Sequence, residues 1–176
     1  SEAQACFTYI FMPVFVISLL SQFVYQPVIS KMALLWHEKK ISQFNKLILR
    51  QIALILLLSV AAIIGGYLLG IPVLSLIYGV DLTDYKKSLV ILLIGGGALA
   101  IVNFLQMIIT VTRKQKLLNI GYLLAFLLFV FGGKTITEKH GMIGISVFYT
   151  AVVMILGAVF IVLTIGIIKG YANSDG

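Results

Sequence analysis

Neutral polar side chains are the groups in this sequence that could contact a ligand inside an otherwise apolar setting. In two apolar segments, 5–30 and 88–112, they recur at helical spacing, within about a 100° arc in the first segment and at i, i+3 and i+7 in the second. The candidate cavity-lining residues are Ser18, Gln22, Tyr25, Asn103, Gln106 and Thr110. Amide and hydroxyl groups so placed can line a wet cavity, or they can join neighbouring helices by hydrogen bonds. The sequence leaves both roles open.

Ionisable side chains are absent from the central part of every apolar segment. A membrane-embedded enzyme would need a buried carboxylate, a paired histidine or a metal cluster, whereas His37 and His140 lie in separate polar segments. Cys6 is the single cysteine, so neither a disulfide nor a cysteine metal site can form within the chain. We therefore expect a protein that is not an enzyme, has no catalytic residue and holds neither a metal ion nor an organic cofactor.

The composition is that of a membrane protein. Hydrophobic residues make up 61% of the 176 residues, charged residues make up 11%, and the mean hydropathy is +1.12, which is too apolar for a water-soluble domain. Uncharged runs alternate with charged segments, and each run has about the 20 residues that a helix needs to cross a bilayer. The sequence predicts an all-α integral membrane protein with a single transmembrane domain over residues 1–176. The expected spans are about 5–30, 48–69, 88–112, 116–134 and 141–168.

Basic residues gather in alternate loops between these spans. The cations that follow the first, third and fifth spans are Lys31, Lys39, Lys40, Lys46, Arg50, Arg113, Lys114, Lys116 and Lys169. The positive-inside rule places this set in the cytoplasm, so the N-terminus is expected outside and the C-terminus in the cytoplasm. Topology accounts for the net charge of +7, and no basic surface with interleaved aromatic residues remains for nucleic acid.

The basic segment TRKQK at 112–116 has two interpretations. It can act as a topology signal alone, or it can attract an anionic group from the cytoplasmic leaflet, because cationic side chains pair well with phosphate. For the second role we take Arg50, Arg113 and Lys114 as candidate residues for an anionic headgroup at the cytoplasmic mouth. Arg113 is expected to continue the polar stripe that begins at Asn103.

Local breaks are expected where prolines, glycines and charges interrupt the apolar pattern. Pro13 and Pro27 should kink the first span, and a polar elbow at 37–40 should precede the second, with Ser42 as its helix cap. Gly70 is expected to end that span, so that a short helix near 72–79, closed by Gly79, lies at the outer membrane interface. An overlong helix with a kink is the alternative.

Several quoted motifs together resemble a known family. They are QPVISKMA, HEKKISQFNKLILRQ, GIPVLSLIYGVDLTDYKKS, VTRKQK and KHGMIGISVFYTAVV. This pattern resembles the C-terminal half of the polysaccharide (O-antigen and capsule) flippases of the multidrug/oligosaccharidyl-lipid/polysaccharide exporter superfamily, which is MATE-like. The resemblance implies that the five spans form most of one six-helix bundle of a two-bundle transporter in the bacterial inner membrane.

The resemblance also implies a function and partners. Family members move lipid-linked oligosaccharide, typically repeat units on undecaprenyl pyrophosphate, across the inner membrane by alternating access. The implied partners are this substrate, the bilayer, a missing N-terminal helix bundle of the same protein and other polysaccharide-assembly proteins. This sequence departs from the family in having no cation at mid-depth to hold a pyrophosphate. A MATE-type drug or cation antiporter and a non-transporting assembly subunit are the alternatives.

Overall fold

The computed structural model describes residues 2–173 and, within them, the side chains of residues 6–133, 136 and 141–171. Helices dominate this part of the chain, and no strand occurs in it. The segments that are long and apolar enough to cross a membrane are Cys6–His37, Ile41–Tyr78, Thr83–Val111, Gln115–Gly133 and Gly141–Tyr171. The prediction of an all-helical chain with five membrane-spanning helices is thereby confirmed at the level of length and composition.

The first crossing consists of α1 (Glu2–Tyr25), a 3₁₀ turn at Gln26–Val28 and α2 (Ile29–His37). Pro13 lies inside α1, whose helical assignment continues past it. Pro27 lies in the 3₁₀ turn, where the ring removes one backbone donor and the helix tightens locally. The regular α-helix expected to kink at both prolines is therefore interrupted at Pro27, while it continues through Pro13.

A tight elbow joins α2 to α3 (Ile41–Gly65). The backbone N–H of Glu38 donates to Leu34 O at 2.8 Å and that of Lys40 to Leu35 O at 3.0 Å, while Lys39 adopts a left-handed φ of 59°. The predicted elbow is confirmed, but the predicted cap is wrong. Lys40 holds the N-cap position without a side-chain bond, because α3 begins at Ile41 and leaves Ser42 inside its first turn.

The expected break at Gly70 is not found. Gly70 has right-handed helical torsions of −57° and −53°, and a π-helical turn at Gly66–Gly70 joins α3 to α4 (Ile71–Tyr78). A glycine can end a helix when it turns left-handed, but here a single wide turn accommodates the strain and the backbone stays helical. The left-handed end comes at Gly79, with φ 66°, as predicted, and its N–H donates to Ser75 O at 2.9 Å.

The turn after α4 is fastened by Asp81. Its Oδ1 accepts hydrogen bonds from the Thr83 hydroxyl at 2.6 Å and from the Thr83 N–H at 2.9 Å. These bonds, first from the side chain and then from the backbone, lower the pKa of the fully exposed Asp81 carboxyl.

We expect the substitution Thr83→Val to raise the pKa of Asp81 towards its ordinary value, because the hydroxyl donor is lost while the backbone donor remains. The stabilisation that comes from the lowered pKa is present above the ordinary aspartate pKa and is lost as the pH falls through the lowered value. Carbon-13 NMR titration of the carboxyl carbon measures the shift. Thr83→Ser keeps the hydroxyl and should keep the low pKa, whereas an unchanged pKa in Thr83→Val would contradict this assignment.

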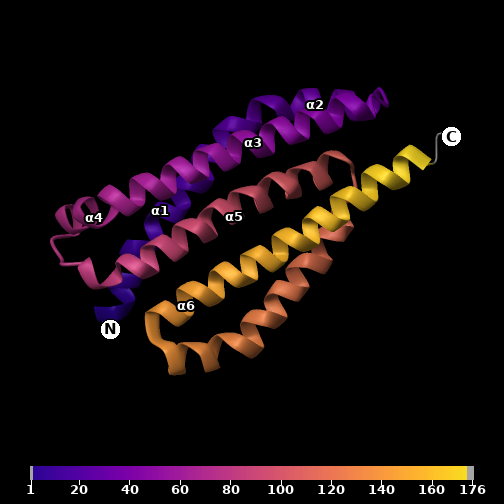
Figure 1. Cartoon of the computed structure of the whole chain (residues 1–176). Helices are drawn as coiled ribbons and strands as arrows, with labels where there is room; N and C mark the ends of the chain where they lie inside the picture. Colours follow the sequence, from indigo (N-terminus) through magenta and orange to yellow (C-terminus); the bar gives the residue numbers. More distant parts are fainter. Residues whose placement is uncertain (1, 174–176) are drawn as a thin grey trace.

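The last two crossings complete a set of antiparallel helices around α5 (Lys86–Val111). After α5 comes a short 3₁₀ turn, Gln115–Leu117, and then α6 (Leu118–Asn173), which reverses at a kink where Gly141 has φ 55° and ψ −143°. Figure 1 shows the two parts of α6 running antiparallel on either side of this kink. The segment 135–140, which was expected to separate the last two spans, is helical in its backbone up to the kink, and its side chains lie outside the described set, apart from Ile136.

The elements divide the bundle into two ends. One end carries the α2–α3 elbow, the turn after α5 and the C-terminal part of α6, and the other carries α4, the N-terminus and the Gly141 kink (Figure 1). We call the first the basic end, because the cations of 31–50 and 113–116 lie towards it. The alternation of charged loops predicted from the sequence is therefore found in the helix arrangement.

The centre of the bundle is α5, which packs against α1, α3 and α6. Its glycine triplet shows how closely these helices approach. A Cβ added at Gly95 would meet Thr150 and Tyr149 of α6, one at Gly96 would meet Val14 and Ile17 of α1, and one at Gly97 would meet Ser59 of α3. Because successive residues turn by about 100°, three adjacent glycines allow close contact with three different helices.

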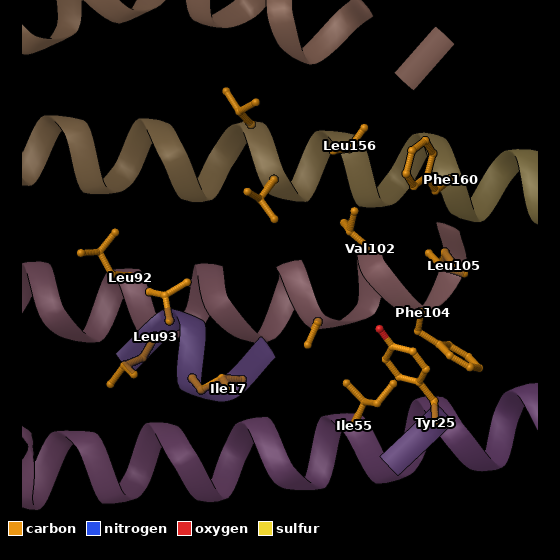
Figure 2. Packing of buried hydrophobic residues seen from close by; sticks show 14 of the residues in the cluster. Ile17, Tyr25, Ile55, Leu92, Leu93, Val102, Phe104, Leu105, Leu156 and Phe160 are labelled. Atoms are coloured by element: carbon orange, nitrogen blue, oxygen red, sulfur yellow. The ribbon is translucent and has the colours of Figure 1, made fainter. Parts of the chain in front are cut away.

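Larger apolar side chains fill the spaces on either side of this triplet. Figure 2 shows Val102 and Leu105 of α5 directed towards Leu156 and Phe160 of α6, while Phe104 lies on the other side of α5. Phe104 is fully buried there beside Tyr25 of α1, and Ile55 of α3 is buried close by. The opposite faces of the outer helices expose many large apolar side chains, as expected for helices that contact lipid.

Candidate functional site

A groove with a volume of about 450 Å³ lies between α1 and α5, in the half of the bundle nearer the basic end. We call it the polar groove. Its lining residues are Gln22, Tyr25, Gln26, Ile29, Asn103, Gln106, Met107, Thr110 and Val111. The structure thus brings together five of the six neutral polar residues predicted to line a cavity, and they come from two helices far apart in sequence.

The sixth residue, Ser18, lies just behind the groove. Its side chain is buried, and its Oγ accepts a hydrogen bond from Asn103 Nδ2 at 2.9 Å. This bond fixes one end of the Asn103 amide while the rest of the side chain lines the groove. Asn103 therefore both joins α5 to α1 and contributes to the groove surface.

Gln106 is held from the other side of α5. The Tyr122 hydroxyl of α6 donates to Gln106 Oε1 at 2.6 Å, which leaves the amide Nε2 as the part of Gln106 with a donor to offer. Thr110 donates its hydroxyl to the backbone oxygen of Gln106 at 2.9 Å and keeps its acceptor lone pairs. The two roles that the sequence left open, helix joining and groove lining, thus coexist in the same side chains.

Tyr25 forms the inner wall of the groove. Its ring packs against Phe104 with a centroid distance of 5.5 Å and an interplanar angle of 50°, and only 6% of the residue is exposed. The wall is therefore a buried aromatic ring that packs on the core residue Phe104. Gln26 and Met107 add to the lining without having been predicted as site residues. Gln26 lies in the 3₁₀ turn that follows α1, and Met107 is an apolar residue of α5.

The predicted cationic residues lie elsewhere. Arg113 and Lys114 line a second, larger cavity of about 1050 Å³ at the basic end, and Arg50 lines neither this cavity nor the polar groove. The prediction that Arg113 continues the Asn103 stripe is wrong. Because α5 ends at Val111 and Arg113 has φ 60°, the chain turns before Arg113 can occupy the next position on that helical face.

The turn that redirects Arg113 repeats the geometry of the elbow before α3. Lys114 N–H donates to Ile109 O at 3.1 Å, just as Lys40 N–H donates to Leu35 O, and a basic residue holds the left-handed position in both turns. Glycine normally occupies that position. These helix ends were therefore difficult to predict from the sequence, because neither turn contains the glycine that usually marks such an end.

Gln51 of α3 is a buried polar residue that the sequence analysis did not select. It is 5% exposed, and its Oε1 has no hydrogen-bond partner among the described residues. It shares the buried face of α3 with Phe44, Ile48 and Ile55. That spacing was the available signal, since a glutamine within an apolar stripe must be either buried or aimed at a cavity.

The chemistry open to this site is the binding of a polar, uncharged group. The groove offers amide and hydroxyl groups, and the described part of the chain holds no group of three histidine, cysteine or acidic side chains that could bind a metal ion. Comparisons of the chain with models of protein families, with curated proteins and with solved structures return no significant match.

Proposed function

We propose that this chain forms part of a transporter that moves a lipid with a polar headgroup across a membrane, specifically a lipid-linked oligosaccharide of surface polysaccharide synthesis in the bacterial inner membrane. The observation that carries the proposal is the polar groove, a set of neutral hydrogen-bonding side chains between two membrane-spanning helices. Amide and hydroxyl side chains can both donate hydrogen bonds to and accept them from the hydroxyl groups of a sugar. The sequence resemblance supports the substrate class.

The position of the groove fits a path that starts at one membrane surface. Its residues extend along α5 from Asn103 to Val111, close to the basic end, so a headgroup would enter it from the leaflet at that end. Alternating access would then need a second bundle facing this one, as in two-bundle transporters. We propose that the N-terminal bundle implied by the resemblance supplies it.

The antiporter alternative requires a different chemistry. Coupling to protons or metal cations normally uses an acidic side chain inside the membrane. The acidic residues whose side chains the structure describes are Glu38, Asp81 and Asp84. All three lie in turns at helix ends. This distribution favours the lipid-linked substrate over a cation-coupled drug within the described part of the chain.

The experiment that tests the proposal removes the polar groups of the groove in the intact gene. We expect Asn103→Leu combined with Gln106→Leu to lower surface polysaccharide about thirtyfold, because two lost hydrogen bonds of about 1 kcal/mol each weaken binding by about 2 kcal/mol, and to cause lipid-linked repeat units to accumulate on the cytoplasmic side. Immunoblotting for surface glycan and extraction of the lipid-linked precursor measure both effects. Met107→Leu changes the groove lining without removing a polar group and serves as the matched control.

A further variant separates ligand contact from helix joining. Tyr122→Phe removes the bond that holds Gln106 but leaves its amide in the groove. If Gln106 contacts substrate, Tyr122→Phe should retain most of the export that Gln106→Leu loses, at equal protein abundance in the membrane. Equal losses in the two variants would mean that the amide only joins helices, and export that survives the double variant would overturn the proposed function.

A further inference from the structure

The large cavity at the basic end, which we call the basic cavity, is built from three elements. It lies among Trp36 of α2, the turn at 113–117 and residues 162–171 of α6, and its volume is about 1050 Å³. The wall from α6 consists of Val162, Leu163, Gly166, Ile167, Gly170 and Tyr171. Ligand sites commonly measure about 300–1,000 Å³, so the basic cavity can hold a sizeable headgroup.

The charge of the basic cavity has one sign. Arg113, Lys114 and Lys116 all line it and are exposed, and no acidic side chain appears in the lining from the described residues. The nearby Glu38 is paired with Lys40 at 2.8 Å in the elbow. Three cations concentrated at one wall create a positive potential that attracts an anionic group.

The remaining walls suit the interfacial part of a lipid. The Trp36 ring packs on the Tyr171 ring at a centroid distance of 4.4 Å, and both residues line the cavity. Tryptophan and tyrosine are the side chains that favour the membrane interface. On α6, Val162 is 68% exposed, and it is followed one turn later by Gly166, which leaves an apolar surface beside the cations. A phosphate near the cations would place its glycerol and acyl chains along this surface.

We propose that the basic cavity binds the headgroup of one anionic glycerophospholipid from the leaflet at the basic end. Basic pockets between membrane helices bind such headgroups, because the cations neutralise the phosphate and the neighbouring helix accommodates the chains. The proposal is independent of the proposed function, since the basic cavity and the polar groove share no lining residue. The resident lipid would fill the space beside the contact that Trp36 of α2 makes with Tyr171 of α6.

Trp36 makes the site measurable, because it is the only tryptophan in the sequence and it lines the basic cavity. The full chain is reconstituted in phosphatidylcholine nanodiscs that contain phosphatidylglycerol brominated near the headgroup, and the quenching of Trp36 is compared with that by brominated phosphatidylcholine at equal mole fraction. We expect phosphatidylglycerol to be preferred about fivefold or more, and the preference to fall with added salt.

The test variant is Arg113→Gly combined with Lys116→Gln, for which the preference should fall to about one. Glycine suits the left-handed Arg113 position, so this change removes the charge and retains the turn. Lys116→Gln alone should give a phosphatidylglycerol preference between those of the native chain and the double variant. This single variant leaves Arg113 and its left-handed turn unchanged, so it tests the charge effect alone. Lys87→Gln removes an exposed cation of α5 at the opposite end and should leave the preference unchanged.

Two results would overturn the proposal. One is equal quenching by the two lipids in the native chain, and the other is a preference that survives in the test variant. Inorganic pyrophosphate added to nanodiscs without anionic lipid is the remaining arm. If pyrophosphate alters Trp36 fluorescence while phosphatidylglycerol shows no preference, the cavity binds a soluble phosphate instead of a lipid.

Discussion

Gly97→Leu is expected to separate α3 from α5 and to lower the free energy of unfolding by about 1–3 kcal/mol, even though leucine favours the helix more than glycine does. A Cβ at this position would lie 2.9 Å from Ser59 Cβ and 3.1 Å from Ser59 Oγ. Ser59 Cβ is fixed to the α3 backbone, and its hydroxyl is already bonded to Ile55 O at 2.8 Å. No rotamer change can therefore relieve the clash.

Large side chains at the neighbouring glycines of the triplet should also destabilise the bundle, because they would clash with other helices. At Gly96 an added Cβ would lie 3.3 Å from the backbone Cα of Val14, so a large side chain there must move α1 as a whole. Reversible unfolding in mixed micelles, followed by near-ultraviolet circular dichroism, measures the loss for each variant.

Gly65→Leu is the matched control for these substitutions. Gly65 has α3 torsions like an ordinary helical residue, and an added Cβ would meet nothing within 4 Å. We expect it to be neutral or slightly stabilising, because only the helix propensity changes. A gain in stability at Gly97 similar to that at Gly65 would contradict the close approach of α3 and α5.

Much of the helix arrangement could be predicted because a bilayer imposes simple rules on sequence. Uncharged runs of sufficient length had to be helices, and charges confined to alternate loops had to gather at alternate ends. Three adjacent glycines in a span are also a pattern that permits close helix packing. The helix that each glycine faces could not be predicted, because it depends on the rotation of α5 relative to α1, α3 and α6.

Helix ends were harder to predict than helix positions. Gly70 looked like a terminator, yet its torsions stay right-handed and a π turn continues the helix, whereas the real ends after α2 and α5 use Lys39 and Arg113 in left-handed conformations. A residue type biases such a position by only about 1 kcal/mol, and tertiary packing can override that bias.

The sequence could predict which residues of the candidate site share a helical face, but not which side chains form hydrogen bonds with one another. The i, i+3, i+7 spacing placed Asn103, Gln106 and Thr110 on one side of α5, and the structure puts that side against α1. The bond from Tyr122 to Gln106 joins residues whose helices meet only after a tight turn, so no local pattern indicates it. Gln51 was overlooked, although its position within the apolar stripe of α3 was a signal that could have identified it.

Phe104→Ala should destabilise the bundle by about 2–3 kcal/mol, whereas Phe23→Ala should change its stability by less than about 0.5 kcal/mol. Phe104 is 0% exposed and packs on Tyr25, while Phe23, on the outer face of α1, is 72% exposed. The loss at Phe104 should be smaller than the roughly 3–5 kcal/mol found in water-soluble cores, because lipid is as apolar as the protein interior and only the cavity and lost dispersion contacts remain.

The same unfolding measurement in micelles compares the two phenylalanines, which differ only in what surrounds them. In water an exposed phenylalanine would favour aggregation, but in a bilayer acyl chains replace the missing protein contacts, so truncation leaves no unfilled space. Equal losses at Phe104 and Phe23 would contradict a lipid-facing position for Phe23. Such a result would instead place another protein surface against this face of α1, where a second bundle of the proposed transporter could dock.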